Sequence, residues 1–247
     1  MGVVLIERWT EFAGAVLHRI DADGNRAYAF RCARPPVTAQ GAPDAYHPDD
    51  TGSGSLRDSG WPDGAWRERL VPDPHRPQQP LRQSEGACAG CFVSTTALAD
   101  PRFPRSNPQA YLDAGRVPYL AMPAAWLAQP GAGGVGDFVV VHECATARSS
   151  FGLIGDAGGG RALGEMSERM ASDLSGMRAH ARSGRGAPQG PLLCVVFPGS
   201  RREPAWPLRN STLRARCEQL LRPLGGTSRL AKMADSLAGL PASPPEE

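Results

Sequence analysis

The chain has 247 residues, enough for one large domain or two small ones. Its 27 basic and 25 acidic residues leave a net charge of +2, so the composition gives no indication of nucleic-acid binding. The 29 glycines and 24 prolines make up more than a fifth of the chain, which favours short strands and turns over a helical bundle.

The first residues, MGVVLIERWTEF, have an apolar run that ends at Ile6, directly before Glu7 and Arg8. A secretory signal has a basic segment followed by a longer apolar one, and a membrane span needs about 20 apolar residues. Classical export and a membrane span are therefore not predicted.

Six cysteines form an even set, and two of them, Cys88 and Cys91, have CxxC spacing. A structural zinc site needs a second such pair, which the sequence lacks. No βαβ pattern typical of a redox motif surrounds the pair. We therefore expect a disulfide or two free thiols here and no metal site.

Residues 1–34 contain two short strand-like runs, AVLHRI and AYAFRC, joined by the turn residues DADGN, which predicts a β-hairpin. Residues 35–87 are rich in Pro, Gly, Asp and Ser and have no sustained periodicity. A loop this long in a domain is usually either functional or disordered. Tyr46, Trp61 and Trp66 make it too aromatic for a plain linker.

Residues 88–226 have a more regular pattern. Short runs rich in β-branched and aromatic residues predict strands at CFVSTTAL, VPYLAM, GDFVVVHE, FGLIGD and LLCVVF. Apolar residues at helical spacing predict an amphipathic helix after Glu165, with Met166, Met170, Leu174 and Met177 on its buried face.

A second helix is predicted at NSTLRARCEQLL, with Asn210 or Ser211 as its N-cap. We expect residues 1–226 to form a single β-rich domain and residues 227–247 to be a largely disordered tail.

Two carboxylates stand out in GLIGDAGGGRALGEMS, where Asp156 is expected at the end of a strand and Glu165 in the first turn of a helix. Acidic residues at turns and helix starts are common, so both residues could have ordinary structural roles. A phosphate-binding loop is a weaker interpretation, because the GxGxxG order and the P-loop lysine are absent. A third interpretation is glycoside hydrolysis by two carboxylates on either side of the scissile bond.

The segments YHPDDTG, FVSTTALADPRFP, VPYLAMP, GDFVVVHE, GLIGDAGGGRALGEMS and VVFPGS occur in this order between about residues 42 and 226. Taken together, they resemble the chitosanases of glycoside hydrolase family 75 and their bacterial relatives. The most specific element is Gly-Asp-x-Gly after a strand, followed by Gly-Glu-x-Ser. Where the family typically has Gly-Pro after the aspartate, this chain has AGGG.

The resemblance implies a small β-barrel with one or two flanking helices and a long Pro/Gly-rich loop. It also implies endo-acting, inverting hydrolysis of β-1,4 bonds in a glucosamine-containing polysaccharide, without a metal or organic cofactor. The family's catalytic residues fall on Asp156 and Glu165, with Glu165 as general acid and Asp156 as general base.

A cationic polysaccharide favours acidic subsites and aromatic platforms. The candidate substrate-binding residues are Tyr46, Asp49, Asp50, Trp61, Trp66 and Asp137.

The family resemblance implies an extracellular protein, whereas the missing signal leaves a cytoplasmic location or non-classical export open. The alternative function is that of a non-catalytic carbohydrate-binding protein, or a secreted toxin-like protein acting on cell-wall glycan.

Overall fold

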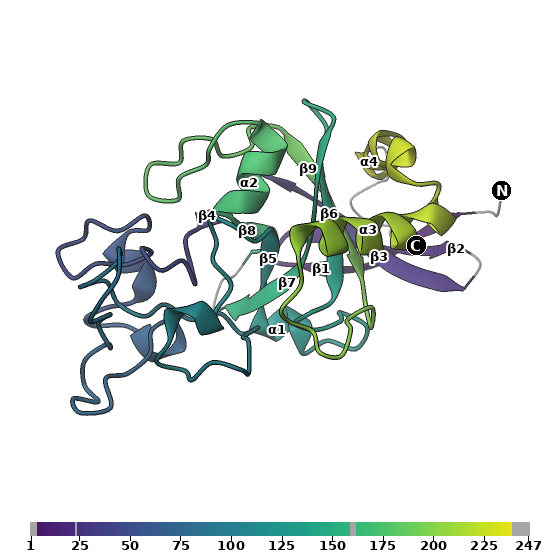
Figure 1. Cartoon of the computed structure of the whole chain (residues 1–247). Helices are drawn as coiled ribbons and strands as arrows, with labels where there is room; N and C mark the ends of the chain where they lie inside the picture. Colours follow the sequence, from purple (N-terminus) through teal and green to yellow (C-terminus); the bar gives the residue numbers. More distant parts are fainter. Residues whose placement is uncertain (1–3, 23, 159–161, 239–247) are drawn as a thin grey trace.

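The computed structural model describes residues 4–22, 24–158 and 162–238. Its strands are β1 (Leu5–Phe12), β2 (Ala15–Ala22), β3 (Asn25–Ala33), β4 (Val37–Thr38), β5 (Tyr119–Pro123), β6 (Phe138–Glu143), β7 (Arg148–Gly158), β8 (Glu165–Ser167) and β9 (Pro191–Phe197). Its α-helices are α1 (Ala124–Leu127), α2 (Glu168–Ser175), α3 (Asn210–Leu221) and α4 (Leu230–Ala238). The prediction of a mainly β fold is confirmed (Figure 1).

All described strands belong to one mixed sheet, in the order β1-β2-β3-β9-β6-β7-β5-β8-β4. Neighbours are antiparallel except β5 with β7 and β4 with β8, which are parallel. The predicted hairpin is present as β2 and β3. Strand β1 was not predicted; it pairs with β2 through a tight turn with positive φ at Ala13 and Gly14.

The sheet curls around an apolar cluster. Side chains from β2, β3, β5, β6, β7, β8 and β9 contribute to this cluster, although β3 and β5 are far apart in the strand order. Trp126, directly after β5, donates a hydrogen bond of 3.0 Å to the Tyr28 hydroxyl on β3 across the cluster. The described strands do not close into a cylinder, so the expected barrel is not confirmed.

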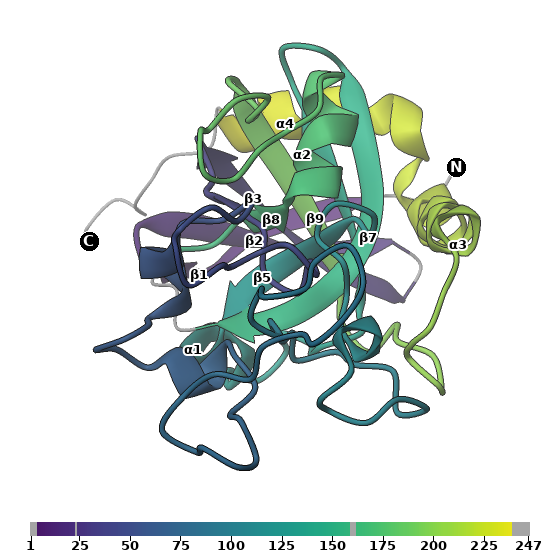
Figure 2. The ribbon, with the colours of Figure 1, turned by 60° about the vertical axis from the view of Figure 1, so that its left-hand side comes forward.

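The opposite face of the sheet is covered by α3, α4 and a loop-rich lobe, residues 39–118 (Figures 1 and 2). The lobe buries Tyr46, Trp66, Leu70, Phe92 and Leu112 in the same cluster as sheet residues.

The prediction of a strand at CFVSTTAL, which lies in this lobe, was wrong, because the segment forms only isolated bridges. Its hydroxyl side chains bind distant backbone instead. Ser94 accepts a hydrogen bond from Gly41 N–H, and Thr96 accepts one from Leu112 N–H.

The helix predicted after Glu165 is present as α2, but it begins later than expected. Ser167 is its N-cap and accepts a hydrogen bond from Met170 N–H, so Glu165 lies in β8 and not in a helical turn. Helix α2 ends at Gly176, which has a φ of 73°, and Met177 beyond it is 55% exposed instead of buried.

The second predicted helix, α3, begins at Asn210 after the N-cap Arg209, so neither proposed cap was correct. The Asn210 side chain donates to the carbonyl of Arg116. The predicted tail contains α4 in its described part, and four residues of α4 are buried: Leu230, Met233, Ala234 and Leu237.

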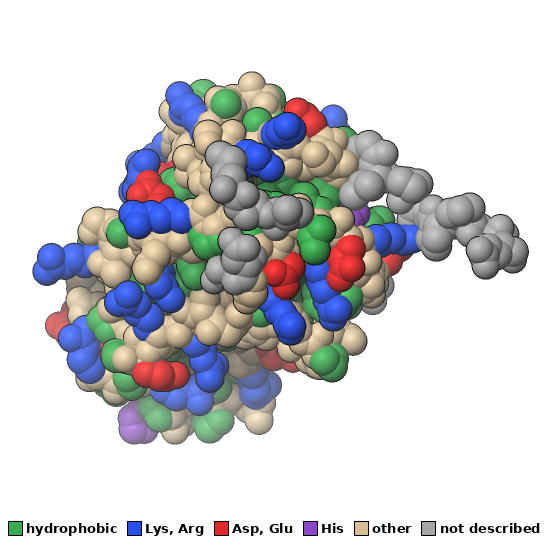
Figure 3. All heavy atoms as spheres, turned by 90° about the vertical axis from the view of Figure 1, so that its right-hand side faces the viewer, with side chains coloured by type: hydrophobic (Ala, Val, Ile, Leu, Met, Phe, Trp, Pro, Cys, Tyr) green, Lys and Arg blue, Asp and Glu red, His purple; other side chains and the backbone are tan. Residues whose placement is uncertain are grey.

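The surface carries charges of both signs. Figure 3 shows Arg and Lys side chains interspersed with Asp and Glu on one face. None of the described helices is both long and apolar enough to cross a membrane. Cys88 and Cys91 are free thiols.

His18 on β2 predicts acid sensitivity of the fold. It is 4% exposed, and neither ring nitrogen has a hydrogen-bond partner. Burial, and secondarily the charge of Arg8, lower its pKa. The unfolded chain then binds more protons, so the stability that neutral His18 provides is present above about pH 6.5 and is lost as the pH falls below it.

We therefore expect His18→Leu to reduce the loss of melting temperature between neutral and mildly acidic pH, measured by thermal denaturation. His75→Leu, at an exposed position, serves as the control and should behave as the unmodified protein does. Parallel melting curves for His18→Leu and the unmodified protein would contradict this account.

Candidate functional site

The two candidate catalytic carboxylates lie on strands that flank β5. Asp156 on β7 and Glu165 on β8 are both paired with Ala121, one from each side. Directly opposed residues on neighbouring strands project from the same face of a sheet. Asp156 and Glu165 therefore face the loop-rich lobe together, with only the methyl group of Ala121 between them.

This register sets the separation of the pair. Neighbouring strands lie about 4.8 Å apart, so two steps across the sheet place the two Cα atoms about 10 Å apart. A β-bulge adjusts the register, because Leu120 pairs with Ile154 whereas the next residue, Ala121, pairs with Asp156. Gly155 is the additional residue, and a Cβ there would lie 2.7 Å from the side chain of Tyr119. Glycine at this position therefore allows the bulge.

Asp156 is fixed by backbone donors. Its Oδ1 accepts a hydrogen bond of 2.7 Å from Ala97 N–H, and the adjacent Gly155 carbonyl accepts one of 3.0 Å from Leu98 N–H. Burial raises the pKa of Asp156, while hydrogen bonds from the N–H groups of Ala97 and Ala157 lower it. These donors favour the ionised carboxylate.

Glu165 has a different environment. Burial is the main cause that raises its pKa, and the charge of Asp156 raises it further, whereas Arg69 and a hydrogen bond with Thr38 lower it. Asp156 contributes to the rise because two nearby carboxylates do not ionise independently. A neighbouring negative charge therefore helps to raise the pKa of Glu165. For Asp156 the causes are burial, two backbone hydrogen bonds and the charge of Arg69.

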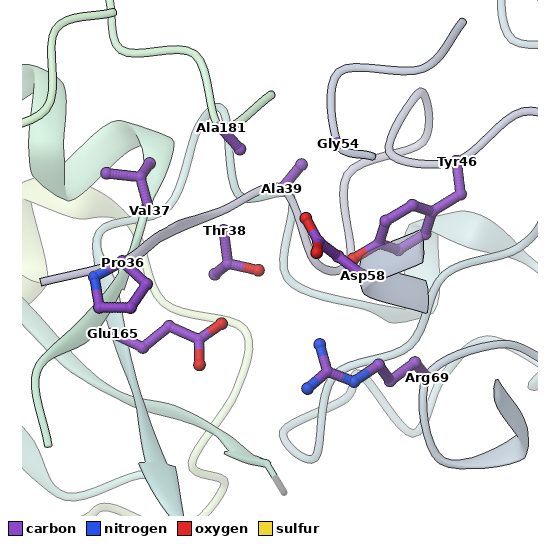
Figure 4. A pocket seen from close by; sticks show the side chains of 10 residues that line it. All are labelled: Pro36, Val37, Thr38, Ala39, Tyr46, Gly54, Asp58, Arg69, Glu165 and Ala181. Atoms are coloured by element: carbon purple, nitrogen blue, oxygen red, sulfur yellow. The ribbon is translucent and has the colours of Figure 1, made fainter. Parts of the chain in front are cut away.

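Glu165 opens into a cavity of about 270 Å³ between the sheet and the lobe (Figure 4). The sheet side contributes Pro36, Val37, Thr38 and Glu165, and the lobe contributes Ala39, Tyr46, Gly54, Asp58 and Arg69, with Ala181 at the rim. In the close-up the guanidinium of Arg69 points across the cavity toward the Glu165 carboxylate. Asp156 is not among the described residues that line this cavity; it lies on the other side of Ala121.

Gln40 connects the supports of both carboxylates. Its side-chain amide donates to the carbonyls of Thr95 at 2.6 Å and Arg69 at 3.2 Å, and its Oε1 accepts from the Tyr46 hydroxyl at 3.0 Å. Its backbone carbonyl accepts a hydrogen bond of 2.6 Å from the Tyr119 hydroxyl on β5. Gln40 is 2% exposed, so its own polar groups depend on these partners in place of water.

The aromatic candidates occupy different places. Tyr46 lines the cavity. Trp66 is 3% exposed and is covered by Arg67, so it belongs to the lobe core. Trp61 is half-buried, packs edge-on against Trp66 with ring centres 5.4 Å apart, and lines a separate surface hollow.

The acidic candidates lie away from the pair. Both carboxylate oxygens of Asp137 are occupied, because Oδ2 accepts from the N–H groups of Gly134 and Gly199 and Oδ1 from that of Arg201. Asp50 is paired with Arg182 at 2.7 Å, which lowers its pKa, and it lines the same hollow as Trp61. Asp49 is exposed beside His47.

Four residues of the site were not predicted from the sequence: Thr38, Gln40, Asp58 and Arg69. They lie in or next to the long segment without periodicity, where spacing gives no information about contacts. The density of glycine and proline predicted a loop, but it gave no information on which polar side chains of this loop face β8. The described His, Cys, Asp and Glu residues form no group of three that could bind a metal ion.

Comparison with known proteins gives no family for this chain. No family model matches the sequence. No curated protein matches it either.

Gln40 gives a test of this site architecture. We expect Gln40→Ala to lower the free energy of unfolding by about 1 to 3 kcal/mol, because it removes three side-chain hydrogen bonds and leaves the Thr95 carbonyl without its partner. Urea denaturation measures the effect, and the exposed Gln129→Ala provides a matched control that should stay within about 0.5 kcal/mol of the unmodified protein. Equal midpoints for the two variants would mean that the Gln40 contacts contribute nothing to stability.

Proposed function

We propose that the chain is an endo-acting glycoside hydrolase that cleaves a glucosamine-containing polysaccharide with inversion. The observation that supports this most strongly is the common pairing of Asp156 and Glu165 with Ala121. In this proposal the scissile bond and the attacking water lie between these two carboxylates, which project from one face of the sheet on either side of the Ala121 methyl group.

The separation favours inversion over retention. An inverting enzyme needs its carboxyl groups about 6.5–9.5 Å apart, whereas a retaining enzyme needs about 5–5.5 Å. Cα atoms about 10 Å apart, with side chains projecting in the same direction, agree better with the larger separation.

In the proposed reaction, Glu165 donates its proton to the glycosidic oxygen as the bond from this oxygen to the anomeric carbon breaks. Asp156 accepts a proton from the water whose oxygen forms the new bond to the anomeric carbon on the opposite face. Burial and the negative charge of Asp156 raise the pKa of Glu165, which supports its role as the acid. Burial raises the pKa of Asp156 as well, and the amide donors that oppose this rise support its role as the base.

The surroundings give further support. Trp61, half-buried at the neighbouring surface hollow, supplies an aromatic group, whereas Tyr46 at the cavity is 1% exposed. The small β-barrel implied by the resemblance is part of the same proposal, and the curl of the sheet around its inner apolar cluster is in agreement with it.

We expect the purified protein to release reducing ends from chitosan or a related amino-sugar polymer. Asp156→Asn and Glu165→Gln should each lower the rate by roughly 100-fold or more, because general acid and base catalysis each contribute at least this much. Asp235→Asn, at an exposed carboxylate on α4 outside the cavity, is the matched control and should retain the full rate.

Reducing ends released at the unmodified rate by Asp156→Asn and Glu165→Gln would refute the assignment of the pair. Binding of the polymers without any release by the unmodified protein would favour the alternative, a non-catalytic carbohydrate-binding protein.

A further inference from the structure

Arg69 is rigidly placed at its backbone. Its N–H donates to the Trp66 carbonyl at 2.9 Å, and its own carbonyl accepts hydrogen bonds from Thr95 N–H at 2.8 Å and from the Gln40 side chain at 3.2 Å. The lobe therefore fixes the point from which the side chain reaches into the cavity (Figure 4).

The guanidinium of Arg69 has no carboxylate within 4.0 Å among the described residues. It has a hydrogen bond with a neutral group, the hydroxyl of Tyr46. Arg182 at the neighbouring hollow differs, because it is paired with Asp50 at 2.7 Å. An arginine that faces a cavity without a paired carboxylate keeps N–H donors for a ligand.

The chemistry of arginine restricts what it can bind. A guanidinium has five N–H donors and no acceptor, and the ammonium group of a protonated glucosamine is also a donor without an acceptor. The two groups repel each other and cannot form a hydrogen bond. An acetamido carbonyl or a carboxylate can accept from the guanidinium, and the carboxylate adds charge. Asp58, the other acid of the cavity besides Glu165, is exposed, so solvent weakens its attraction for an amine.

We propose that Arg69 determines specificity by selecting, for the sugar unit between itself and Glu165, a substituent with an acceptor oxygen instead of a protonated amine. The acceptor is the carbonyl of an acetamido group or a carboxylate. This inference rests on the proposed function for its place in the reaction, but it makes a separate claim about binding.

The test compares the unmodified protein with Arg69→Gln and with the control Arg67→Gln, whose exposed side chain lies over Trp66 outside the cavity. Three polymers are used at a pH at which free amines are protonated: fully deacetylated chitosan, partially acetylated chitosan, and glycan strands containing muramic acid, which carries a carboxylate. The rate at which reducing ends form gives kcat/KM for each polymer. Mass spectrometry identifies the sugar at the new chain end. Calorimetry with short oligomers gives the binding affinity.

We expect the unmodified protein and Arg67→Gln to prefer an acetylated or carboxylated polymer by roughly 10-fold or more over deacetylated chitosan. Arg69→Gln should lose most of this preference. A preference for the acetylated polymer identifies the amide as the acceptor, and a preference for muramic acid strands identifies the carboxylate.

The outcomes separate the two proposals. Cleavage with the same substrate ratios in all three proteins would overturn the role of Arg69 and leave the hydrolase intact. A binding preference that is lost in Arg69→Gln, without cleavage, would support the role of Arg69 and refute the hydrolase. No preference in either binding or cleavage would overturn this inference.

Discussion

The site depends on one feature of the sheet, the position of β5 between β7 and β8. Because Ala121 pairs with both neighbours, Asp156 and Glu165 share a face and a row although nine positions separate them in the chain. The bulge at Gly155 brings Asp156 into this row, and alanine at the centre puts only a methyl group between the two strands that carry the carboxylates. A strand slip of one residue would move either carboxylate to the other face.

The loop-rich lobe forms the second wall of the site, opposite the sheet. It covers the row, removes solvent from the two carboxylates and thereby raises the pKa of both. Gln40 joins the lobe to β5 and, through Thr95, to the segment whose Ala97 N–H binds Asp156. The same residue fixes the backbone of Arg69, so one buried amide supports the charges on both sides of the cavity.

The sequence predicted the parts of this protein that follow local rules. Alternating and continuous apolar runs identified the strands from β5 to β7 and β9, and the motif identified the carboxylate pair as a candidate. Glu165 was misplaced in a helix because helical spacing begins at Met166, and only the capping bonds of Ser167 show that the helix begins two residues later. Gln40 and Arg69 could not be found, because long-range hydrogen bonds leave no periodic pattern. The glycines at positions 159 and 160, part of the AGGG run that follows Asp156, lie outside the described residues.

The central claim is that Asp156 and Glu165 act on one sugar from opposite sides of Ala121, far enough apart for water to enter. The anomeric configuration of the first product, followed by proton NMR during hydrolysis of a β-linked amino-sugar oligomer, tests it most directly. The account predicts that the α-anomer appears first and then equilibrates with the β-anomer. Initial release of the β-anomer would show retention and would contradict the geometry proposed for the pair.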